Sequence, residues 1–290
     1  MRIVITGAEG QLGVELVPAL TALGEVIGTT IADLDITDPD CVNRLAALAP
    51  DWVVHAAAVT DVDGCEWEPT RAMTVNAEGT RRVAEGCRCV GAGLLYLSTD
   101  YVFDGRKGIS YTESDAPVPL NVYGRSKLEG ERATRSLAPR WIIIRTAWLY
   151  GTHGKNFVKT ILGKVAAGEQ LRVVDDQVGS PTYARDLADA VALLLSRGLT
   201  GLYHVTNSDS CSWYDFAREI LRLSGSDPSA LGRMTSAELS RSARRPAYAV
   251  LENAAWQAAG LPPLRPWPEA LAAMLAALRS KPQMDANEHE

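Results

Sequence analysis

The stretch that decides the fold is Ile3-Val4-Ile5-Thr6-Gly7-Ala8-Glu9-Gly10-Gln11-Leu12-Gly13. It joins a short β-rich run to a GxxGxxG loop, and leucines at helical spacing continue through residues 11–23. In such a loop Gly7 permits a tight turn, Gly10 lets a pyrophosphate approach the backbone, and Gly13 allows close helix–strand packing. The helix start adds unpaired N–H groups and the positive end of the helix dipole. The pattern predicts a dinucleotide site that includes Gln11 and Leu12; a glycine-rich turn without a ligand is the alternative.

The first half of the chain repeats this alternation of strand and helix. Helical spacing predicts a helix over residues 39–48, with Pro39 in its first turn, and a long helix over residues 71–90. Short apolar runs predict strands over residues 2–6, 25–30, 51–55, 94–98 and 141–145. Near-continuous apolar strands separated by helices are typical of a parallel sheet covered on both faces. We therefore predict an α/β fold, a Rossmann-type doubly wound parallel sheet.

The second half is less regular and predicts a smaller mixed α/β lobe that binds substrate. Residues 224–245 are rich in Ser, Gly and Arg and predict a loop. The expected helices are 157–167, 185–195, 213–223 and 268–278, and the expected strands are 171–174 and 201–205. We assign to the Rossmann domain residues 1–150 with returning segments near 180–206 and 245–252. The lobe takes residues 151–179 and 207–280, and residues 281–290 form a flexible tail.

Composition limits the class of protein. The 290 residues are 47% hydrophobic with a net charge of −6, which excludes general disorder and argues against a non-specific nucleic-acid binder. No apolar run is long enough to span a bilayer, and no secretory signal pattern opens the sequence. Five cysteines without CxxC spacing predict free thiols in a reducing compartment. We expect a cytoplasmic protein that acts without a nucleic-acid or membrane partner.

The end of the second predicted strand leaves the choice between NAD and NADP open. An Asp or Glu there would read the 2′-hydroxyl, and an Arg or Lys would read a 2′-phosphate. Thr29 and Thr30 stand at that point instead. Asp35 with Ile36 follows and can reach the adenine edge, or Asp35 can cap the helix that begins near Pro39.

A YxxxK motif and a polar strand end predict the catalytic groups. Tyr123 and Lys127 share one helix face, and an ammonium near a phenol favours phenolate and lowers the pKa of the tyrosine. The fourth predicted strand ends in Ser98-Thr99-Asp100-Tyr101, at the carboxyl edge where open α/β sheets bind ligands. The Thr99 hydroxyl can there hydrogen-bond a substrate carbonyl. Glycine loop, hydroxyl and YxxxK in this order predict carbonyl reduction with a nicotinamide cofactor.

With these motifs, nearly the whole chain resembles the extended short-chain dehydrogenase/reductase superfamily. Within it the chain is most similar to the dTDP-4-dehydrorhamnose reductase family. The segments that carry the resemblance are residues 7–13, 34–39, 56–63, 98–105, 119–124, 145–151, 156–157 and 176–182, with the neighbourhoods of Arg245-Pro246 and Trp267. STDYVFDG at residues 98–105 and DQVGSPT at residues 176–182 are the most specific of them.

The resemblance implies the reaction and the roles of its residues. NADPH or NADH would reduce the C4 keto group of dTDP-4-dehydro-6-deoxy-L-mannose to give dTDP-L-rhamnose. Tyr123 would protonate the alkoxide, Lys127 would lower the tyrosine pKa and hold the nicotinamide ribose, and Thr99 would polarise the keto oxygen. The other implied substrate residues are Asp100, Tyr101, Trp148 and Asn156. The other implied cofactor residues are Ala56, Ala57, Ala58 and Thr60.

The sequence departs from the family pattern at two places. His55 stands where many relatives have Asn, and Gly64-Cys65 replaces a frequent Lys-Ala pair. Some members bind Mg²⁺ through glutamates at a dimer interface, and Glu15 matches one such position. One glutamate makes no site, so Mg²⁺ and a homodimer rest on the resemblance alone.

Alternatives remain for the activity and for several residues. The chain could be another dTDP-4-keto-6-deoxy-hexose 4-ketoreductase, an epimerase or dehydratase that recycles its NAD, or a non-catalytic regulatory homologue. Trp148 could belong to the core instead of the pocket. Two clusters of charged residues have two interpretations each, a ligand site or solvated side chains. The basic cluster, Arg241, Arg244 and Arg245, could bind a diphosphate. The acidic cluster, Asp61, Asp63 and Glu66, could bind a metal.

Overall fold

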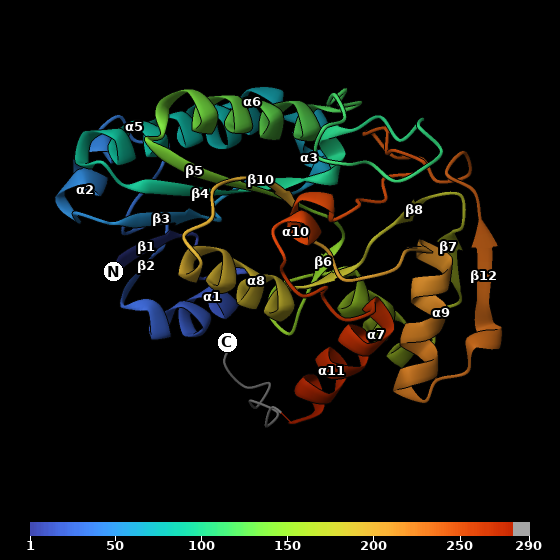
Figure 1. The fold of residues 1–290 in the computed structure, drawn as a ribbon. Coiled ribbons are helices and arrows are strands. Elements are labelled where there is room, and N and C mark those ends of the chain that lie inside the picture. Colours follow the sequence, from blue (N-terminus) through green and yellow to red (C-terminus); the bar gives the residue numbers. More distant parts are fainter. Residues whose placement is uncertain (281–290) are drawn as a thin grey trace, which may run out of the picture.

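A six-stranded parallel sheet forms the centre of the protein, and the computed structural model describes residues 1–280 (Figure 1). The predicted tail, residues 281–290, lies outside the described residues. The strand order is β10-β5-β4-β3-β1-β2, with the first strand of the chain near the middle. The strands are β1 (Arg2–Thr6), β2 (Glu25–Thr29), β3 (Trp52–His55), β4 (Gly93–Thr99), β5 (Arg140–Thr146) and β10 (Gly201–His204). The Rossmann-type sheet predicted from the sequence is confirmed.

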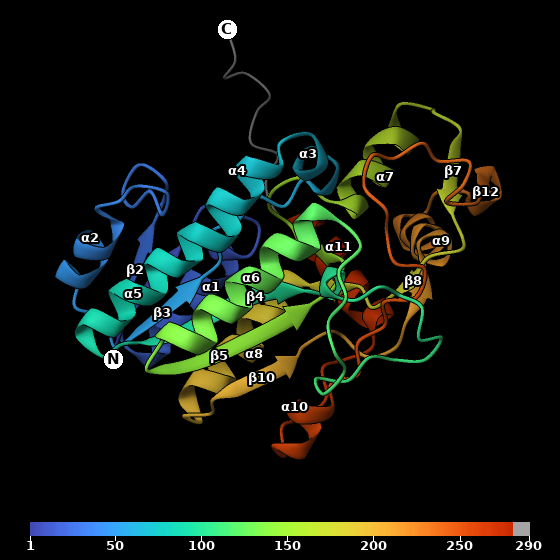
Figure 2. The same ribbon diagram turned by 90° about the horizontal axis from the view of Figure 1, so that it is seen from above.

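Helices cover both faces of this sheet (Figures 1 and 2). Successive strand side chains point to opposite faces, so Ile3 and Ile5 of β1 pack against one helix layer and Val4 against the other. One layer contains α1 (Gly13–Leu20) and α8 (Ala184–Ser196), and the other contains α2 (Cys41–Ala47), α5 (Thr80–Val90) and α6 (Val122–Leu137). Burial on both faces explains why the strands are apolar at nearly every position.

A second set of elements packs beside the sheet around its own apolar core (Figure 2). Phe216, Trp267 and Met274 are buried in this core. Its longer elements are α7 (Phe157–Ala166), β7 (Leu171–Val174), α9 (Trp213–Ser224), β12 (Leu231–Met234) and α11 (Trp267–Ser280). Two-residue strands β6 (Leu149–Tyr150), β8 (Val178–Gly179), β9 (Thr182–Tyr183) and β11 (Cys211–Ser212) connect it, and α10 (Ala254–Ala258) packs near β10. Within the described residues, no helix has the length and apolar character needed to cross a bilayer.

Several predicted boundaries are wrong, each for a local reason. Helix α2 begins at Cys41, because Pro39 lies in a turn that the Asp38 side chain closes by accepting from the Asp40 N–H. Residues 224–245 contain strand β12, which pairs with β7 and buries Leu231, so this stretch is no plain loop. The long helix is α4 (Pro69–Met73), a π-helical segment η2 (Thr74–Gly79) and α5 in succession. Helices α3 (Val62–Trp67) and α10 and the two-residue strands were not predicted from the sequence.

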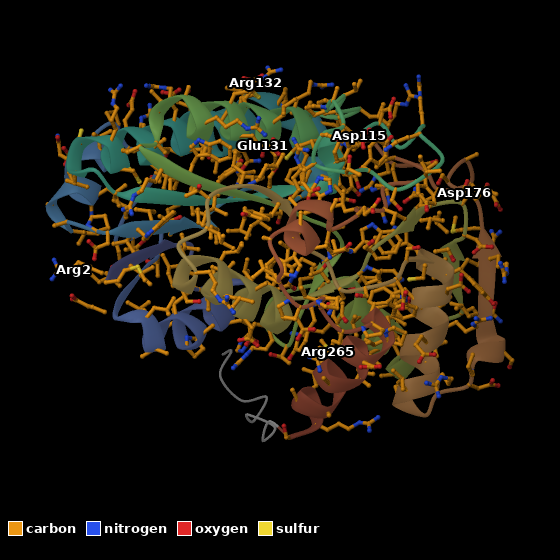
Figure 3. The ribbon with its side chains drawn as sticks, viewed as in Figure 1. Arg2, Asp115, Glu131, Arg132, Asp176 and Arg265 are labelled. Atoms are coloured by element: carbon orange, nitrogen blue, oxygen red, sulfur yellow. The ribbon has the colours of Figure 1, made fainter. Side chains whose placement is uncertain are left out.

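A buried ion pair joins helix α6 to the sheet. The Arg145 guanidinium donates from Nε and Nη2 to the two carboxylate oxygens of Glu131, each at 2.8 Å, and both side chains are 2% exposed. The Ser98 hydroxyl donates to the same carboxylate at 2.6 Å. The pair therefore ties α6, which carries the YxxxK motif, to the strands β4 and β5. Figure 3 shows Glu131 beneath α6 and Arg132 on its outer surface.

Replacing Glu131 by Gln should destabilise the protein strongly, because it leaves the buried Arg145 charge without a counter-charge. The expected loss in free energy of unfolding is about 3–5 kcal/mol, measured by urea denaturation. The matched control is Glu129→Gln on the same helix, where the exposed pair with Arg132 should contribute no more than about 1 kcal/mol. Equal losses in the two variants would contradict this account.

Candidate active site

Two adjoining cavities lie at the carboxyl edge of the sheet and bring most of the predicted site residues together. One measures about 960 Å³ and the other about 440 Å³, and they share Gly7, Gly10, Ala56 and Ala58 in their walls. Asp35, Ile36 and Ala57 line the larger cavity. The smaller cavity is lined by Gln11, Leu12, Gly13, Thr60, Thr99, Asp100, Tyr101, Tyr123, Lys127 and Trp148. Of the predicted catalytic, cofactor and substrate residues, Asn156 is the one that lines neither.

The glycine loop has the geometry that a dinucleotide site needs. Gly7 has a φ of +72°, and a side chain there would come within 2.9 Å of the Ala57 backbone. A Cβ at Gly13 would lie 2.2 Å from the carbonyl oxygen of Gly7, so only glycine lets α1 start this close to the loop. The N–H groups of Gln11 and Leu12 have no partner within residues 1–280. This cradle fits a pyrophosphate at the start of α1.

Asp35 was expected either to reach the adenine or to cap the helix near Pro39, and its hydrogen bonds distinguish these two roles. Its carboxylate accepts from the N–H and hydroxyl of Thr37, at 2.8 and 2.7 Å, while the residue before helix α2 is Asp40. Asp35 therefore does not cap that helix and stays in the cavity wall. Trp67, which is 70% exposed, lines the same cavity. It was not predicted from the sequence, because no periodic pattern marks its short helix.

Tyr123, Lys127 and Thr99 converge on the smaller cavity. The Asn121 side chain accepts from the Gly124 N–H at 2.8 Å and so caps α6, which begins one residue before Tyr123. Thr99 ends β4, and its hydroxyl accepts from the Tyr101 N–H at 3.2 Å. All three functional side chains are buried. The hydroxyl, phenol and lysine predicted to act together thus line one cavity.

The pKa of Tyr123 is raised in the folded protein, opposite to the lowering expected from Lys127. Burial raises the Tyr123 pKa, the Asp100 carboxylate adds to this, and a hydrogen bond with Thr99 only partly opposes it. Burial also lowers the Lys127 pKa to about 7, against the opposing effect of Glu131. The Lys127 ammonium lies 4.3 Å from the centre of the Tyr96 ring. Desolvation therefore outweighs the attraction that the spacing of the motif suggests.

Asp100 is an unusual group in this cavity. One carboxylate oxygen accepts from the Thr99 hydroxyl at 3.0 Å, and the other is buried without a partner within residues 1–280. Burial raises the Asp100 pKa to about 7, although hydrogen bonds with Thr99 and the backbone oppose the shift. Near neutral pH this side chain therefore exists both as a carboxylic acid and as a carboxylate.

Replacing Asp100 by Asn should change how stability depends on pH. The Asp100 pKa is higher in the folded than in the unfolded protein, so the folded state binds more protons between about pH 4 and pH 7. As pH rises through this window, the wild type should lose stability relative to Asp100→Asn by ~1.4 kcal/mol per pH unit at most. Urea denaturation of both proteins at pH 5 and pH 8 measures this. Parallel changes in the two proteins would show that Asp100 ionises normally.

An aromatic pair forms another wall of the smaller cavity. Trp148 has a φ of +46°, a strained backbone for a bulky residue, and its ring stacks on Trp213 at 3.5 Å with an interplanar angle of 8°. A Cβ at Gly179 would lie 2.5 Å from the Trp148 ring, so glycine leaves room for the indole. Trp148 is half-buried, lines the cavity and also packs against the core of the lobe, so it combines the two roles considered for it. Trp213 and Lys155 also line it and were not predicted, because Trp213 lies outside every recognised motif and Lys155 directly precedes the segment 156–157 without being part of it.

Asn156 holds the backbone of the lobe in place. Its side chain accepts from the Lys159 N–H at 3.1 Å to cap α7, and its amide donates to Gln11 Oε1 at 3.0 Å and to the Gly151 carbonyl at 2.8 Å. The substrate contact that the resemblance implies for Asn156 has no support from this geometry, because both polar atoms of the side chain already have partners.

The remaining candidates have structural partners. His55 lies between the Thr6 and Thr80 hydroxyls, and burial lowers its pKa to about 3. Asp63 forms ion pairs with Arg241 at 3.0 Å and Arg245 at 2.9 Å. Asp61 caps α3 and Glu66 accepts from the Val122 N–H, and in residues 1–280 no three His, Cys, Asp or Glu side chains group to hold a metal.

Comparisons with known proteins agree with this geometry. The family model for the RmlD substrate binding domain matches residues 1–280. A dTDP-4-dehydrorhamnose reductase of Streptomyces griseus is 46% identical over 286 residues, which cover 96% of this chain and 94% of that protein. A dTDP-4-keto-6-deoxy-D-glucose reductase of Streptomyces niveus is 42% identical, covering 93% and 95%. The structure of a dTDP-4-dehydrorhamnose reductase from Bacillus anthracis in complex with NADP superposes with a TM-score of 0.90 at 36% identity, covering 95% and 99%.

Proposed function

The chain belongs to the RmlD substrate binding domain family, and from this premise we propose that it reduces the C4 keto group of dTDP-4-dehydro-6-deoxy-L-mannose to give dTDP-L-rhamnose. It is an NAD(P)H-dependent oxidoreductase of nucleotide-sugar biosynthesis. The observation that carries the proposal is that Thr99, Tyr123 and Lys127 line the smaller cavity, which shares the glycine loop with the larger cavity. The lobe of residues 151–179 and 207–280 would supply the sugar-nucleotide side of the site.

The residues of the smaller cavity suit the proton transfer that this reduction requires. A bound nicotinamide cofactor supplies the hydride to C4. The Thr99 hydroxyl, whose one proton goes to Asp100 in the structure, would turn to donate it to the keto oxygen and stabilise the developing charge there. The raised pKa of Tyr123 keeps the phenol protonated at neutral pH, so it is ready to donate its proton to that oxygen. Lys127, buried one turn further along α6, would hold the ribose side of the cofactor.

Asp100 adds a second titrating group beside the proton donor. Its carboxylate raises the pKa of Tyr123, so loss of its charge would make the phenol a stronger acid. Tyr101 packs edge-on to Tyr123, with ring centres 5.7 Å apart, and covers the other side of the phenol. In this proposal Asp100, Tyr101 and Trp148 surround the sugar, and Asn156 acts only by positioning the chain near Gln11.

The cofactor would lie along both cavities. Its pyrophosphate would meet the open N–H groups of Gln11 and Leu12, with Asp35 and Ile36 toward the adenine and the alanines 56–58 beneath the ribose. Thr29 and Thr30, at the end of β2, are neither an acidic reader of the 2′-hydroxyl nor a basic reader of a 2′-phosphate, so the cofactor preference is left to experiment. The relative from Bacillus anthracis holds NADP, so NADPH is the first cofactor to try.

A magnesium ion has no place in the chemistry proposed here. Glu15, the one residue that matches a metal ligand of some relatives, accepts from Thr152 at 3.4 Å and lies 3.8 Å from Arg185. Its neighbours within residues 1–280 of one chain do not complete a ligand set. A homodimer remains a prediction, which the molar mass in solution, from sedimentation or light scattering, would test.

The direct test follows the absorbance of reduced cofactor with dTDP-4-dehydro-6-deoxy-L-mannose generated in situ from dTDP-glucose. NADPH and NADH are compared, with and without Mg²⁺, and the product is identified by chromatography. Consumption of cofactor with dTDP-L-rhamnose as the product is expected. A protein that binds NADPH and leaves it unconsumed would overturn the proposal in favour of a different 4-keto sugar or a regulatory homologue.

The alternative substrate is another dTDP-4-keto-6-deoxy hexose. It is favoured by the relative from Streptomyces niveus, whose name specifies a D-glucose sugar and whose identity to this chain is close to that of the rhamnose enzymes. The same assay with dTDP-4-keto-6-deoxy-D-glucose alone separates the two, because only the alternative consumes NADPH without prior epimerisation.

Tyr123→Phe should lower kcat by at least about 100-fold, because the phenolic proton is the one transferred. Binding of NADPH should be nearly unchanged, which fluorescence titration measures. Tyr214→Phe, on α9 and outside both cavities, is the matched control and should retain wild-type activity. Retention of most of the rate in Tyr123→Phe would show that another group donates the proton.

A further inference from the structure

The smaller cavity contains one exposed cation for which the proposed reaction has no role so far. Among the described residues, the basic side chains that line this cavity are Lys127 and Lys155. Lys127 is buried against the Tyr96 ring, whereas Lys155 is exposed. The Lys155 ammonium has no ion-pair or hydrogen-bond partner within residues 1–280. An uncompensated positive charge in a cavity wall attracts an anionic ligand.

The backbone around Lys155 is held firmly against the glycine loop. Gly154 has a φ of +64°, and a Cβ there would lie 3.3 Å from the Gln11 side chain. Gln11 donates to the Leu149 carbonyl at 3.0 Å and accepts from Asn156 at 3.0 Å, so it is bonded on both sides of this segment. Lys155 therefore extends from a fixed point between Gly154 and the N-terminal cap of α7.

The nearby arginines do not offer a comparable charge. Arg245 and Arg241 both pair with Asp63, at 2.9 and 3.0 Å, and neither lines the smaller cavity. The Asp63 carboxylate, whose pKa is lowered mainly by its hydrogen bond with Arg245, stays ionised at neutral pH and compensates these charges. Lys155 thus remains the available cation on the lobe side of this cavity.

Two diphosphates must be accommodated, and the structure offers separate donors for each. The open N–H groups of Gln11 and Leu12 at the start of α1 suit the pyrophosphate of the cofactor. Lys155 follows β6 in the chain and shares the wall of the smaller cavity with Trp148 and Trp213, and it does not line the larger cavity that suits the adenosine. A lysine binds a phosphate as a compact point charge with three donors.

We propose that Lys155 binds the diphosphate of the nucleotide-sugar substrate and so anchors the sugar beside Tyr123. This inference rests on the proposed function, because it takes the ligand of the lobe to be a nucleoside diphosphate sugar. Lys155 makes its contact with a part of the substrate that does not react. It therefore contributes to substrate binding in the ground and transition states alike.

The experiment measures binding of dTDP and of NADPH by titration calorimetry to the wild type and to two matched variants, Lys155→Met and Lys159→Met. Both substitutions remove an exposed charge, and Lys159 lies one turn further on and lines neither cavity. Lys155→Met should weaken dTDP binding about tenfold, equivalent to ~1.4 kcal/mol, with the affinity for NADPH unchanged. Lys159→Met should leave both affinities at the wild-type value, and Lys155→Arg should restore most of the dTDP affinity.

The remaining outcomes separate this inference from the proposed function. In steady-state assays Lys155→Met should raise KM for the dTDP-sugar with little change in kcat, and its dTDP affinity should depend less on salt than that of the wild type. Equal dTDP affinity in the wild type and Lys155→Met would overturn the role proposed for Lys155 and leave the proposed function unaffected. Weakened NADPH binding would assign the lysine to the cofactor instead. A wild type that binds NADPH but no dTDP would overturn the substrate proposed for the whole site.

Discussion

All six strands of the central sheet run in the same direction, and every functional feature of the protein depends on this constraint. Parallel strands bring their carboxyl ends to one edge, so the loops that follow β1, β3, β4 and β5 meet there although they are far apart in sequence. The glycine loop, the alanines 56–58, Thr99 and Trp148 all follow strands of this set. Helix α6 brings Tyr123 and Lys127 to the same edge, and the Glu131–Arg145 pair fixes that helix to the sheet.

Burial shifts the pKa values of the proposed catalytic groups more strongly than their pairwise spacing does. Tyr123, Lys127 and Asp100 are each shifted first by desolvation, in the direction that favours the neutral form. The result is a protonated phenol beside two groups that titrate near neutral pH. Such an arrangement suits the transfer of a single proton to a developing alkoxide, because the acid retains its proton until the reaction requires it.

The lobe contributes shape and charge to the site. Trp148 occupies a left-handed conformation that costs of the order of 1 kcal/mol, and packing against Trp213 and Gly179 holds it there. Strain of this kind persists where the surroundings determine the conformation, as at a ligand-binding wall. Gln11 links this part of the lobe to the glycine loop, because its side chain bonds both Leu149 and Asn156. The proposed cofactor side and the proposed substrate side of the site therefore share one hydrogen-bonded junction.

The sequence by itself determined the alternating strands and helices, the glycine loop and the YxxxK helix, because these depend on local periodicity and on short motifs. It also indicated Thr99, which follows directly after a strand that could be recognised, while the family resemblance added Asp100 and Tyr101. Only the tertiary structure decided the pairing of β12 with β7, the role of Asn156 as a cap, and the partners of Asp63, because these depend on contacts between distant segments. The same holds for Trp213 and Lys155, which reach the cavity through the folding of the lobe, and for the pKa of Tyr123, which depends on how much water the completed fold excludes.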